Sequence, residues 1–475
     1  MAAVSTIFAL SSGPGRAGVA VIRISGPSAR AIIARMAAPV PDPRHVSFRT
    51  IRHPETGDAI DKAVVFWFAG PASETGEDVA ELQLHGGRAV VRATLDALGG
   101  IDGCRLAEHG EFARRAFLNG KIDLVEVEGL ADLVDAETEA QRRQALAQAG
   151  GVLSRLYEGW RTRLIEVAAL AEAAIDFSDE GDVGSGAMAQ ARTRASPLRD
   201  DIARHLADGH RGEILRDGFR VALLGPPNAG KSSLLNALAR REAAIVSEEA
   251  GTTRDVIEVR LDLKGLPVIV SDTAGVREAT GAVEREGIRR SFEAARAADL
   301  VLWLSESGVE PRPDNVSRES LIDVRTKADL SEGAANDQNP LTPALSPRGE
   351  GEGTTHFPKR EGVGTSVYPG GEGDGALAIS SKTGEGVEGL IAMIAARAGA
   401  AVGGCEDPAL TQTRHRQALE QAAAALDDFL TGDPSVPELR AEDVRRAAFA
   451  LGRITGRVDV EDVLDQIFSR FCIGK

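Results

Sequence analysis

The chain has few cysteines and no long apolar run. Its three cysteines, Cys104, Cys405 and Cys472, lie far apart and lack the spacing of a disulfide scaffold or a metal site. No stretch reaches the roughly 18 apolar residues that span a bilayer, and the residues after Met1 lack the pattern of a signal peptide. These absences predict a cytoplasmic protein in a reducing setting, with no membrane partner.

Positive charge is also scarce. The chain carries 55 Lys and Arg against 71 Asp and Glu, which gives a formal net charge of −16 and a pI near 5.1. This balance argues against a protein that simply coats nucleic acid, although it leaves room for a local basic patch. Apolar residues, by contrast, are plentiful. With 43% hydrophobic residues over 475 positions, the chain can build the cores of about three domains.

Residues 1–120 alternate strand and helix patterns, so we expect an α/β domain there. Strands are predicted at 18–25, 63–68 and 78–85, and helices at 28–36 and 89–98. Arg23 and Glu81 place charges inside two of these strand patterns. From the pattern alone, a solvated face is the simpler explanation of both charges.

Residues 121–217 predict a different, all-helical region. Apolar residues recur in steps of three and four between 124 and 170. An acidic, glycine-rich break at 176–186 separates these helices from a further helix predicted at 187–206. We interpret the break as a solvated loop, with a metal site as the less favoured alternative.

Residues 400–475 contain three more amphipathic stretches, at 408–430, 438–454 and 460–471. So short a segment is thin for a core of its own. We therefore expect these helices to pack on those of 121–217. Residues 218–399 would then be a nucleotide-binding domain inserted into one discontinuous helical domain.

The segment 331–376 belongs to no predicted element. It is rich in Pro, Gly and charge and lacks apolar periodicity, so it cannot bury enough surface to offset the entropy lost on ordering. We predict a disordered insertion in the nucleotide-binding domain. A ligand for another domain, at its Pro-rich start, is the less favoured alternative.

The strongest motif is the octapeptide GPPNAGKS at 225–232, which matches the phosphate-binding loop pattern G-x-x-x-x-G-K-[ST]. An apolar strand pattern precedes it and a helical pattern follows, as that loop requires. Its glycines let backbone N–H groups face phosphates, and the helix N-terminus adds partial positive charge. Lys231 is expected to reach the β- and γ-phosphates and Ser232 to bind Mg²⁺.

Four later motifs narrow the nucleotide to guanine. GTTRD at 251–255 lies where a switch segment supplies a Thr hydroxyl to Mg²⁺. DTAG at 272–275 follows a strand, so Asp272 can anchor Mg²⁺ through water while the N–H of Gly275 faces the γ-phosphate. TKAD at 326–329 offers Asp329 to two guanine donors, and SSK at 380–382 completes the base pocket.

Two positions bear on hydrolysis. Many GTPases place Gln after Asp-x-x-Gly to orient the attacking water, but this chain has Val276. Another group must therefore place the water, and Arg277, Glu278 and Glu284 lie just beyond. Asn228, inside the loop, carries a side-chain carbonyl that could coordinate K⁺, whose charge would replace that of an arginine finger.

With these residues in view, the chain resembles the MnmE (TrmE) family of tRNA-modification GTPases over nearly its whole length outside 331–376. In the GTPase part the resemblance rests on PNAGKSSLLNAL at 227–238, REAAIVS at 241–247, AGTTRD at 250–255 and DTAGVRE at 272–278. Elsewhere it rests on TGEDVAELQLHGG at 75–87, GEFARRAFLNGKIDL at 110–124, EAAIDFSDE at 172–180 and FCIGK at 471–475. Era-like ribosome-assembly GTPases, the alternative, share the first group only.

The resemblance implies a multidomain fold, α/β plus all-α. Residues 1–120 would be a tetrahydrofolate-binding domain that forms the homodimer, and residues 218–399 a Ras-like P-loop GTPase domain. The helical domain would comprise 121–217 and 400–475. Arg23, Glu81, Lys121 and Lys475 would contact a 5-formyl- or methylene-tetrahydrofolate, which replaces the solvated-face interpretation of the first two.

For the GTPase part, the resemblance implies that Asn228, Thr252 and the backbone of Ser247 and Glu249 hold K⁺. Ser232 and Thr253 would hold Mg²⁺, Lys231 would act on the phosphates, and Glu284 would position the water through a GTP-state dimer of these domains. The implied GTP contacts are Asn228, Ala229, Gly230, Lys231, Ser232, Ser233, Ser247, Glu248, Glu249, Ala250, Gly251, Thr252, Thr253, Asp272, Thr273, Ala274, Gly275, Thr326, Lys327, Ala328, Asp329, Ser380, Ser381 and Lys382.

The family works with the FAD-containing partner MnmG. Together they add an aminomethyl-type group to C5 of the wobble uridine of certain tRNAs, using the folate one-carbon unit. Cys472, in the C-terminal Cys-Ile-Gly-Lys, fits a prenylation box poorly. A catalytic thiol and a structural cysteine beside the folate site both remain open.

Three positions depart from the family pattern. Pro226 replaces a usual Arg, which the loop backbone should tolerate. Thr326 replaces a usual Asn, and because Thr lacks the donor and acceptor pair of an amide, weaker guanine binding is expected. Ser381 replaces a usual Ala, a small change. The insertion lies between the two base motifs, where it could loosen their pocket.

Overall fold

The structure is a computed structural model. It describes residues 5–177, 181–241, 243–245, 257–272, 295–306, 320–331, 377–403, 409–458 and 461–474. The chain divides into two compact units, one of Met1–Asp217 with Ala401–Lys475 and the other of Gly218–Ala400. Within the described ranges, no helix combines the length and the apolar character needed to cross a bilayer.

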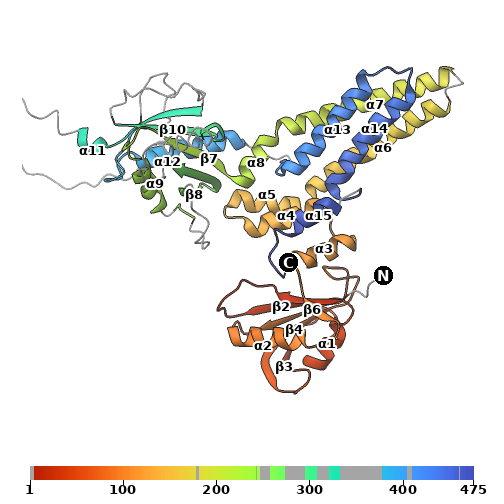
Figure 1. The fold of residues 1–475 in the computed structure, drawn as a ribbon, viewed down its shortest axis with the longest axis vertical. Coiled ribbons are helices and arrows are strands. Elements are labelled where there is room, and N and C mark those ends of the chain that lie inside the picture. Colours follow the sequence, from red (N-terminus) through yellow and green to blue (C-terminus); the bar gives the residue numbers. More distant parts are fainter. Residues whose placement is uncertain are drawn as a thin grey trace, which may run out of the picture. The chain divides into compact units, whose positions relative to one another are not determined.

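The first unit begins with a six-stranded mixed sheet in the order β3-β4-β5-β2-β1-β6 (Figure 1). Its strands are β1 (Thr6–Leu10), β2 (Ala20–Ser25), β3 (Ser47–Arg52), β4 (Ala59–Phe68), β5 (Val79–Leu84) and β6 (Cys104–Leu106). The helices of this part are α1 (Ala29–Met36), α2 (Arg88–Gly99) and α3 (Glu111–Leu118).

The alternation of side chains explains how this sheet is covered. In β2, Ile22 and Ile24 are fully buried, and they share a core with Leu82 of β5 and with Ile32 and Ile33 of α1. Arg23, which lies between them, points to the opposite face because successive side chains of a strand alternate. One face of the sheet is therefore apolar and packed, while the other carries polar groups.

The rest of the first unit is helical. Its helices are α4 (Leu124–Asp135), α5 (Glu139–Ala149), α6 (Val152–Asp176), α7 (Gly181–Ala207), α8 (Gly209–Asp217), α13 (Thr413–Thr431), α14 (Pro437–Thr455) and α15 (Glu461–Phe468). Capping boxes begin α4, with Asp123 and Glu126, and α5, with Thr138 and Gln141. Each box satisfies backbone N–H groups that the first helical turn leaves free.

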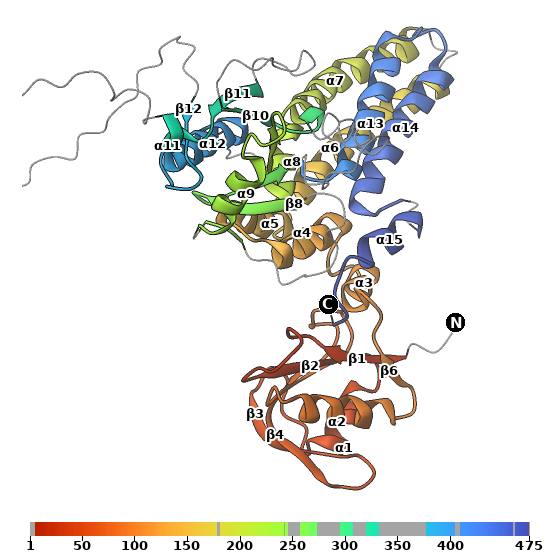
Figure 2. The ribbon, with the colours of Figure 1, turned by 60° about the vertical axis from the view of Figure 1, so that its left-hand side comes forward.

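A single core joins the two separated helical segments. It includes Tyr157, Trp160 and Leu164 of α6, Leu198 of α7, and Phe429 of α13, among other buried residues. Figures 1 and 2 show α6, α7, α13 and α14 side by side in both views. The predicted discontinuous helical domain, interrupted by the nucleotide-binding part, is thus confirmed by its shared core.

The second unit has a six-stranded sheet in the order β12-β11-β10-β7-β9-β8, parallel except for the β8–β9 hairpin. Its elements are β7 (Phe219–Leu224), α9 (Lys231–Ala239), β8 (Ile257–Leu263), β9 (Leu266–Asp272), β10 (Leu300–Ser305), β11 (Leu321–Arg325), α11 (Ala328–Ser331), β12 (Leu377–Ala378) and α12 (Val387–Val402). Residues 221–223 of β7 are fully buried, as expected of a central parallel strand.

Three predicted boundaries are wrong. Helix α7 begins at Gly181, inside the stretch predicted as a loop, and buried Gly184 lies close to the Phe177 backbone, where a larger residue would be crowded. Helix α13 begins only at Thr413, since the side chains before it bond to other helices. Helix α15 ends at Phe468, and the residues after it form a tail. The predicted insertion lies outside the described residues apart from Ser331, which ends α11.

Candidate functional site

The glycine-rich loop lies between β7 and α9, the position its motif predicts. Gly225 has φ +151, and a Cβ built there would lie 2.2 Å from the Leu304 carbonyl oxygen, so only glycine fits. Gly230, with φ +89, precedes α9, and Asn228 also adopts a left-handed conformation at φ 65. Asn tolerates this region better than most residues. The local sequence thus determines the tight turn that presents backbone to a ligand.

Lys231, the first residue of α9, lies against this loop. The residue is only 7% exposed. Its Nζ donates to the carbonyl oxygens of Gly225 at 2.7 Å and Pro226 at 2.9 Å. Burial lowers the pKa of this ammonium, while the neighbouring carboxylate of Asp272 acts in the opposite direction. The structure therefore places the cation at the loop rather than in bulk solvent.

Ser232 and Asp272 meet at the ends of two elements that pack together. The Ser232 hydroxyl donates to Oδ2 of Asp272 at 2.6 Å. Asp272 ends β9 and is 1% exposed. A hydroxyl and a carboxylate are the oxygen ligands that Mg²⁺ prefers, so the donor set fits the predicted ion. Among the described residues there is no cluster of three or more His, Cys, Asp or Glu suited to a metal.

The two predicted base motifs come together although about fifty residues separate them. Oδ1 of Asp329 accepts a hydrogen bond from the Ser380 hydroxyl at 2.7 Å. The backbone N–H of Ala328 donates to the Ile379 carbonyl at 3.1 Å. Lys327 has φ 58 and forms an ion pair with Glu306. Ser380 thus orients the carboxylate that the sequence predicts as the guanine reader.

Thr326 makes a contact that its sequence pattern did not predict. It is 4% exposed, and its hydroxyl donates to the Ala229 carbonyl at 2.8 Å. This bond joins the end of β11 to the phosphate-binding loop. Where the family usually has Asn, the shorter Thr326 side chain therefore braces the loop. The small size and hydroxyl of Thr were the signal, but the partner is 97 residues away.

Replacing Thr326 with valine removes this brace and keeps the side-chain shape. We expect GTP affinity to fall about three- to tenfold, because a net hydrogen bond of about 1 kcal/mol is lost and the Ala229 carbonyl loses a donor. Titration of a fluorescent GTP analogue measures the change. Thr326→Ser, which keeps the hydroxyl, is the matched control and should stay within twofold. Equal losses in both variants would contradict a role for the hydroxyl.

Several predicted site residues lie outside the described ranges, so the structure does not place them. They are Ser247, Glu248, Glu249, Ala250, Gly251, Thr252, Thr253, Thr273, Ala274, Gly275, Val276, Arg277, Glu278, Glu284 and Lys475. The described part of the site is therefore the phosphate-binding loop, the end of β9 and the two base motifs.

In the N-terminal sheet, Arg23 and Glu81 lie opposite each other on β2 and β5. Nε of Arg23 donates to Oε1 of Glu81 at 3.0 Å, and Nη1 of Arg23 lies 2.8 Å from Oε2 of Glu74. The two side chains are 17% and 19% exposed, and the Arg23 guanidinium lies 5.8 Å from the centre of the Phe112 ring. The solvated-face interpretation is thus wrong, since these charges pair in a half-buried position. Glu74 was not predicted.

Lys121 lies nearer the loop that contains Glu74 than the strands. Its Nζ donates to the Pro71 carbonyl oxygen at 3.0 Å. Glu74, in the same loop, is the second partner of Arg23. The structure therefore brings Arg23 and Glu81 into contact. Lys121 is linked to this pair indirectly, through the loop segment that holds both Pro71 and Glu74.

The C-terminal tail docks on the N-terminal sheet. The Phe471 carbonyl lies 2.9 Å from Nδ1 of His109, and Ile473 forms a β-bridge with the same residue. The Ser11 hydroxyl donates to the Gly474 carbonyl at 2.8 Å. Cys472, between these anchors, is an exposed free thiol. Residues 471–474 thus lie near Ser11, which follows β1, the strand whose Ala9 pairs with Arg23.

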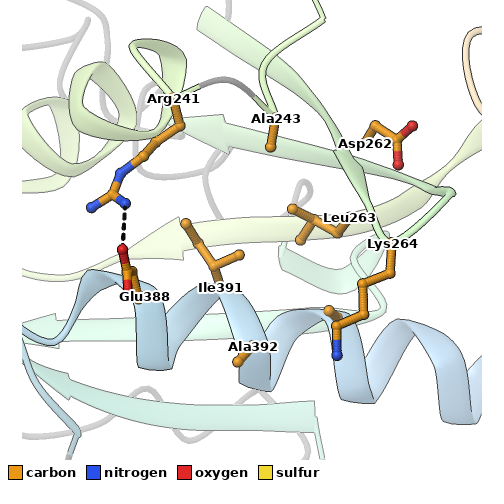
Figure 3. A pocket seen from close by; sticks show the side chains of 9 residues that line it. Arg241, Ala243, Asp262, Leu263, Lys264, Glu388, Ile391 and Ala392 are labelled. Carbon is orange, nitrogen blue, oxygen red and sulfur yellow. Dashed lines mark hydrogen bonds and ion pairs between the residues drawn. The ribbon is translucent and has the colours of Figure 1, made fainter.

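A separate cavity of about 460 Å³ lies in the second unit, beside the β8–β9 turn and α12. Figure 3 shows the Arg241–Glu388 ion pair at one end and Lys264 at the other, with Leu263 and Ile391 between them. None of its lining residues belongs to the predicted nucleotide site. We assign it no part in nucleotide binding.

Two family models match the chain. One, described as GTP-binding protein TrmE N-terminus, matches residues 6–121, and the other, described as MnmE helical domain, matches residues 124–472. The second match alone covers more than half of the 475 residues. The chain belongs to the MnmE family. The predicted family and fold class are thereby confirmed.

Full-length relatives carry the MnmE name. The tRNA modification GTPase MnmE of Methylorubrum populi is 50% identical over 472 residues, which covers 99% of this chain and 98% of the relative. That of Methylobacterium sp. is 52% identical over 474 residues and covers 99% of each. Among solved structures, the G domain of the T. maritima FeoB iron transporter is 23% identical, covers 38% of this chain and 98% of its own, and has a TM-score of 0.22.

The two MnmE-family matches map directly onto the fold. The N-terminal match contains β1 to β6 with α1 to α3, and the helical match runs from α4 to the tail, with the second unit between its two helical parts. Both matches include residues outside the nucleotide-binding unit. They therefore favour the MnmE family over the Era-like alternative.

Proposed function

We propose that this chain is a Mg²⁺-dependent GTPase that acts in the cytoplasm on tRNA modification. Its relatives carry the name tRNA modification GTPase. The observation that carries the proposal is the meeting of Lys231, Ser232 and Asp272 at one loop, next to the Asp329–Ser380 pair. Phosphate, metal and base groups then lie in one unit. The modification state of cellular tRNA tests the proposal.

The roles follow from the chemistry of each group. Lys231 neutralises charge that develops on the transferred phosphoryl, from a position where burial makes its field strong. Ser232 would hold Mg²⁺ directly and Asp272 would anchor it through water, so that the ion would offset phosphate charge. Asp329, oriented by Ser380, accepts hydrogen bonds from guanine. Thr253 would add a second metal ligand, and Glu284 would place the water.

We propose K⁺ as a further cofactor, held by Asn228, Thr252 and the backbone of Ser247 and Glu249. The exposed, left-handed position of Asn228 supports this, because its side-chain carbonyl is free to turn toward a cation beside the loop. K⁺ would supply the positive charge that an arginine finger gives in other GTPases. Equal GTPase rates in K⁺ and Na⁺ buffers would exclude it.

The N-terminal sheet is proposed to bind a tetrahydrofolate that supplies the one-carbon unit. A half-buried Arg23–Glu81 pair on the polar face supports this, since a pterin ring with donors and acceptors matches such a pair. The docked tail brings Cys472 to the same domain, and Lys475 would add a further contact to the folate. A homodimer, and MnmG as a partner in wobble-uridine modification, complete the proposal.

Replacing Glu81 with alanine tests the folate proposal. We expect the affinity for 5-formyltetrahydrofolate to fall at least tenfold, because a direct contact is lost and Arg23 loses one of its two carboxylates. Isothermal titration calorimetry measures the change. Asp96→Ala removes an exposed ion pair with Arg92 from the same domain and is the control. Unchanged affinity in Glu81→Ala would refute the site.

A further inference from the structure

One edge of the N-terminal sheet is unusually basic for this chain. Residues 44–53, RHVSFRTIRH, contain three arginines, two histidines and no acidic residue, whereas the whole chain carries a net charge of −16. The segment includes β3, which is the outermost strand of the sheet beside β4 (Figure 2). An edge strand also leaves one row of backbone N–H and C=O groups without strand partners.

The three arginines of this segment bond to carbonyl oxygens only. Arg44 donates to Ala72, Arg49 to Pro39 at 3.3 Å and Phe48 at 3.1 Å, and Arg52 to Gly57 at 3.0 Å. Within the described ranges, none of these guanidinium groups lies within 4.0 Å of a carboxylate. A carbonyl orients a guanidinium without cancelling its charge. Their positive charges are therefore not offset by a neighbouring carboxylate, with Arg44 and Arg52 exposed and Arg49 half-buried.

The arginines of the helical part are held differently. Arg142 and Arg143 both pair with Glu139, at 2.7 Å each. Arg445 pairs with Glu172 and Glu442, at 2.8 and 2.6 Å. The charges of these three arginines are compensated locally, in contrast to those of the arginines along β3.

An exposed aromatic residue lies among these charges. Phe48 is 64% exposed and lies in β3 next to Arg49. Consecutive side chains of a strand point to opposite faces, so Phe48 and Arg49 flank the free edge on its two sides. A ring in this position offers a flat surface for stacking, and the arginines beside it offer charge.

We infer that this basic edge, defined as Arg44, Phe48, Arg49 and Arg52, binds tRNA. The arginines contact backbone phosphates, and Phe48 stacks on an unpaired base, which is how single-stranded RNA is commonly held. Charge complementarity favours RNA over other partners, since the edge is positive and the rest of the chain is acidic. The inference rests on the proposed function, which supplies tRNA as the RNA.

The arginine contribution is tested by salt dependence. Each phosphate contact adds about 0.7 to 0.9 to the slope of log affinity against log salt. In full-length protein, Arg49→Gln with Arg52→Gln should weaken tRNA binding about tenfold at low salt and make the slope shallower by between one and two. Arg142→Gln with Arg143→Gln changes the net charge equally on the helical part and should leave the slope unchanged. An equal effect of both pairs would overturn the inference.

The aromatic contribution has a different signature. Phe48→Ala should weaken tRNA binding roughly fivefold or more and leave the salt slope unchanged, because stacking releases no counterions. If the Arg49→Gln, Arg52→Gln variant binds tRNA with wild-type affinity, the basic edge does not bind tRNA. If the wild-type protein binds no tRNA, the proposed function fails as well. If the variants convert a dimer to a monomer in sedimentation, the edge is instead a contact between copies and the inference fails.

Discussion

Replacing Lys231 with alanine should lower GTP turnover at least about 100-fold, the largest effect expected for any single residue described. Lys231 is 7% exposed, and its ammonium is held at the loop by two carbonyls, so its charge acts where solvation is poor. No neighbouring cation in the described part of the loop can replace it. Phosphate release under saturating GTP and Mg²⁺ measures the turnover.

Lys264→Gln is the matched control for this experiment. It removes one positive charge from the same unit, at the exposed β8–β9 turn beside the cavity in Figure 3. Its turnover should remain within twofold of the wild type. A Lys231→Ala protein that keeps its circular dichroism spectrum and turns over within threefold of the wild type would show that Lys231 does not act on the phosphates.

Replacing Glu128 with glutamine should strongly destabilise the helical bundle. Glu128 of α4 is 7% exposed, and both of its oxygens accept from Arg414 at 3.0 Å. Arg414 also donates to the carbonyls of Arg453 and Ile454 at the end of α14. Removing the carboxylate leaves a half-buried guanidinium unpaired, which costs about 3–5 kcal/mol. Protection of α13 amides from hydrogen exchange should fall about 100-fold or more.

The same pair predicts a pH dependence. Although burial acts to raise it, the cations of His415 and Arg414 lower the pKa of Glu128 from 4.5 to about 2. Its stabilising effect is therefore present above pH 4.5 and is lost as the pH falls toward 2. Burial lowers the pKa of His415, so that group also destabilises the bundle as the pH falls. The difference in protection between wild type and Glu128→Gln should narrow from pH 5 to pH 3.

The control is Glu139→Gln on the neighbouring α5. It removes a carboxylate that pairs with two arginines on the exposed surface, where screening by solvent makes such pairs weak. Its α13 amides should keep wild-type protection. A Glu128→Gln protein with unchanged protection would mean that the buried pair does not hold α4, α13 and α14 together.

Local sequence patterns were sufficient for much of the fold. The strand at 20–25, the helix at 29–36 and the phosphate-binding turn follow from side-chain alternation, helical spacing and glycine chemistry that involve only near neighbours in the chain. The division of the helical domain also followed from simple reasoning, since the C-terminal helices are too few to bury their apolar faces alone.

Contacts between distant segments were not predictable from such patterns. Thr326 binds Ala229 across 97 residues, and His109 binds Phe471 across 362. Nothing near either residue signals its partner. The start of α7 at Gly181 was also missed, since the glycines at its beginning have weak helix propensity.

The candidate site was predictable to differing degrees. Lys231, Ser232 and Asp272 were identified because phosphate chemistry requires their types at that spacing. For Arg23 and Glu81 the pattern alone suggested solvated charges, and only the family resemblance indicated a site. Charge pairing across two strands depends on their register, which a single strand pattern does not determine.

We propose that this GTPase serves the modification of the tRNA wobble uridine. The most direct measurement is nucleoside analysis of tRNA from cells that lack the protein, compared with cells that express the wild type or Lys231→Ala. We predict that the C5-modified wobble uridine disappears, returns with the wild type and does not return with Lys231→Ala. Unchanged wobble-uridine modification in cells without the protein would contradict the account.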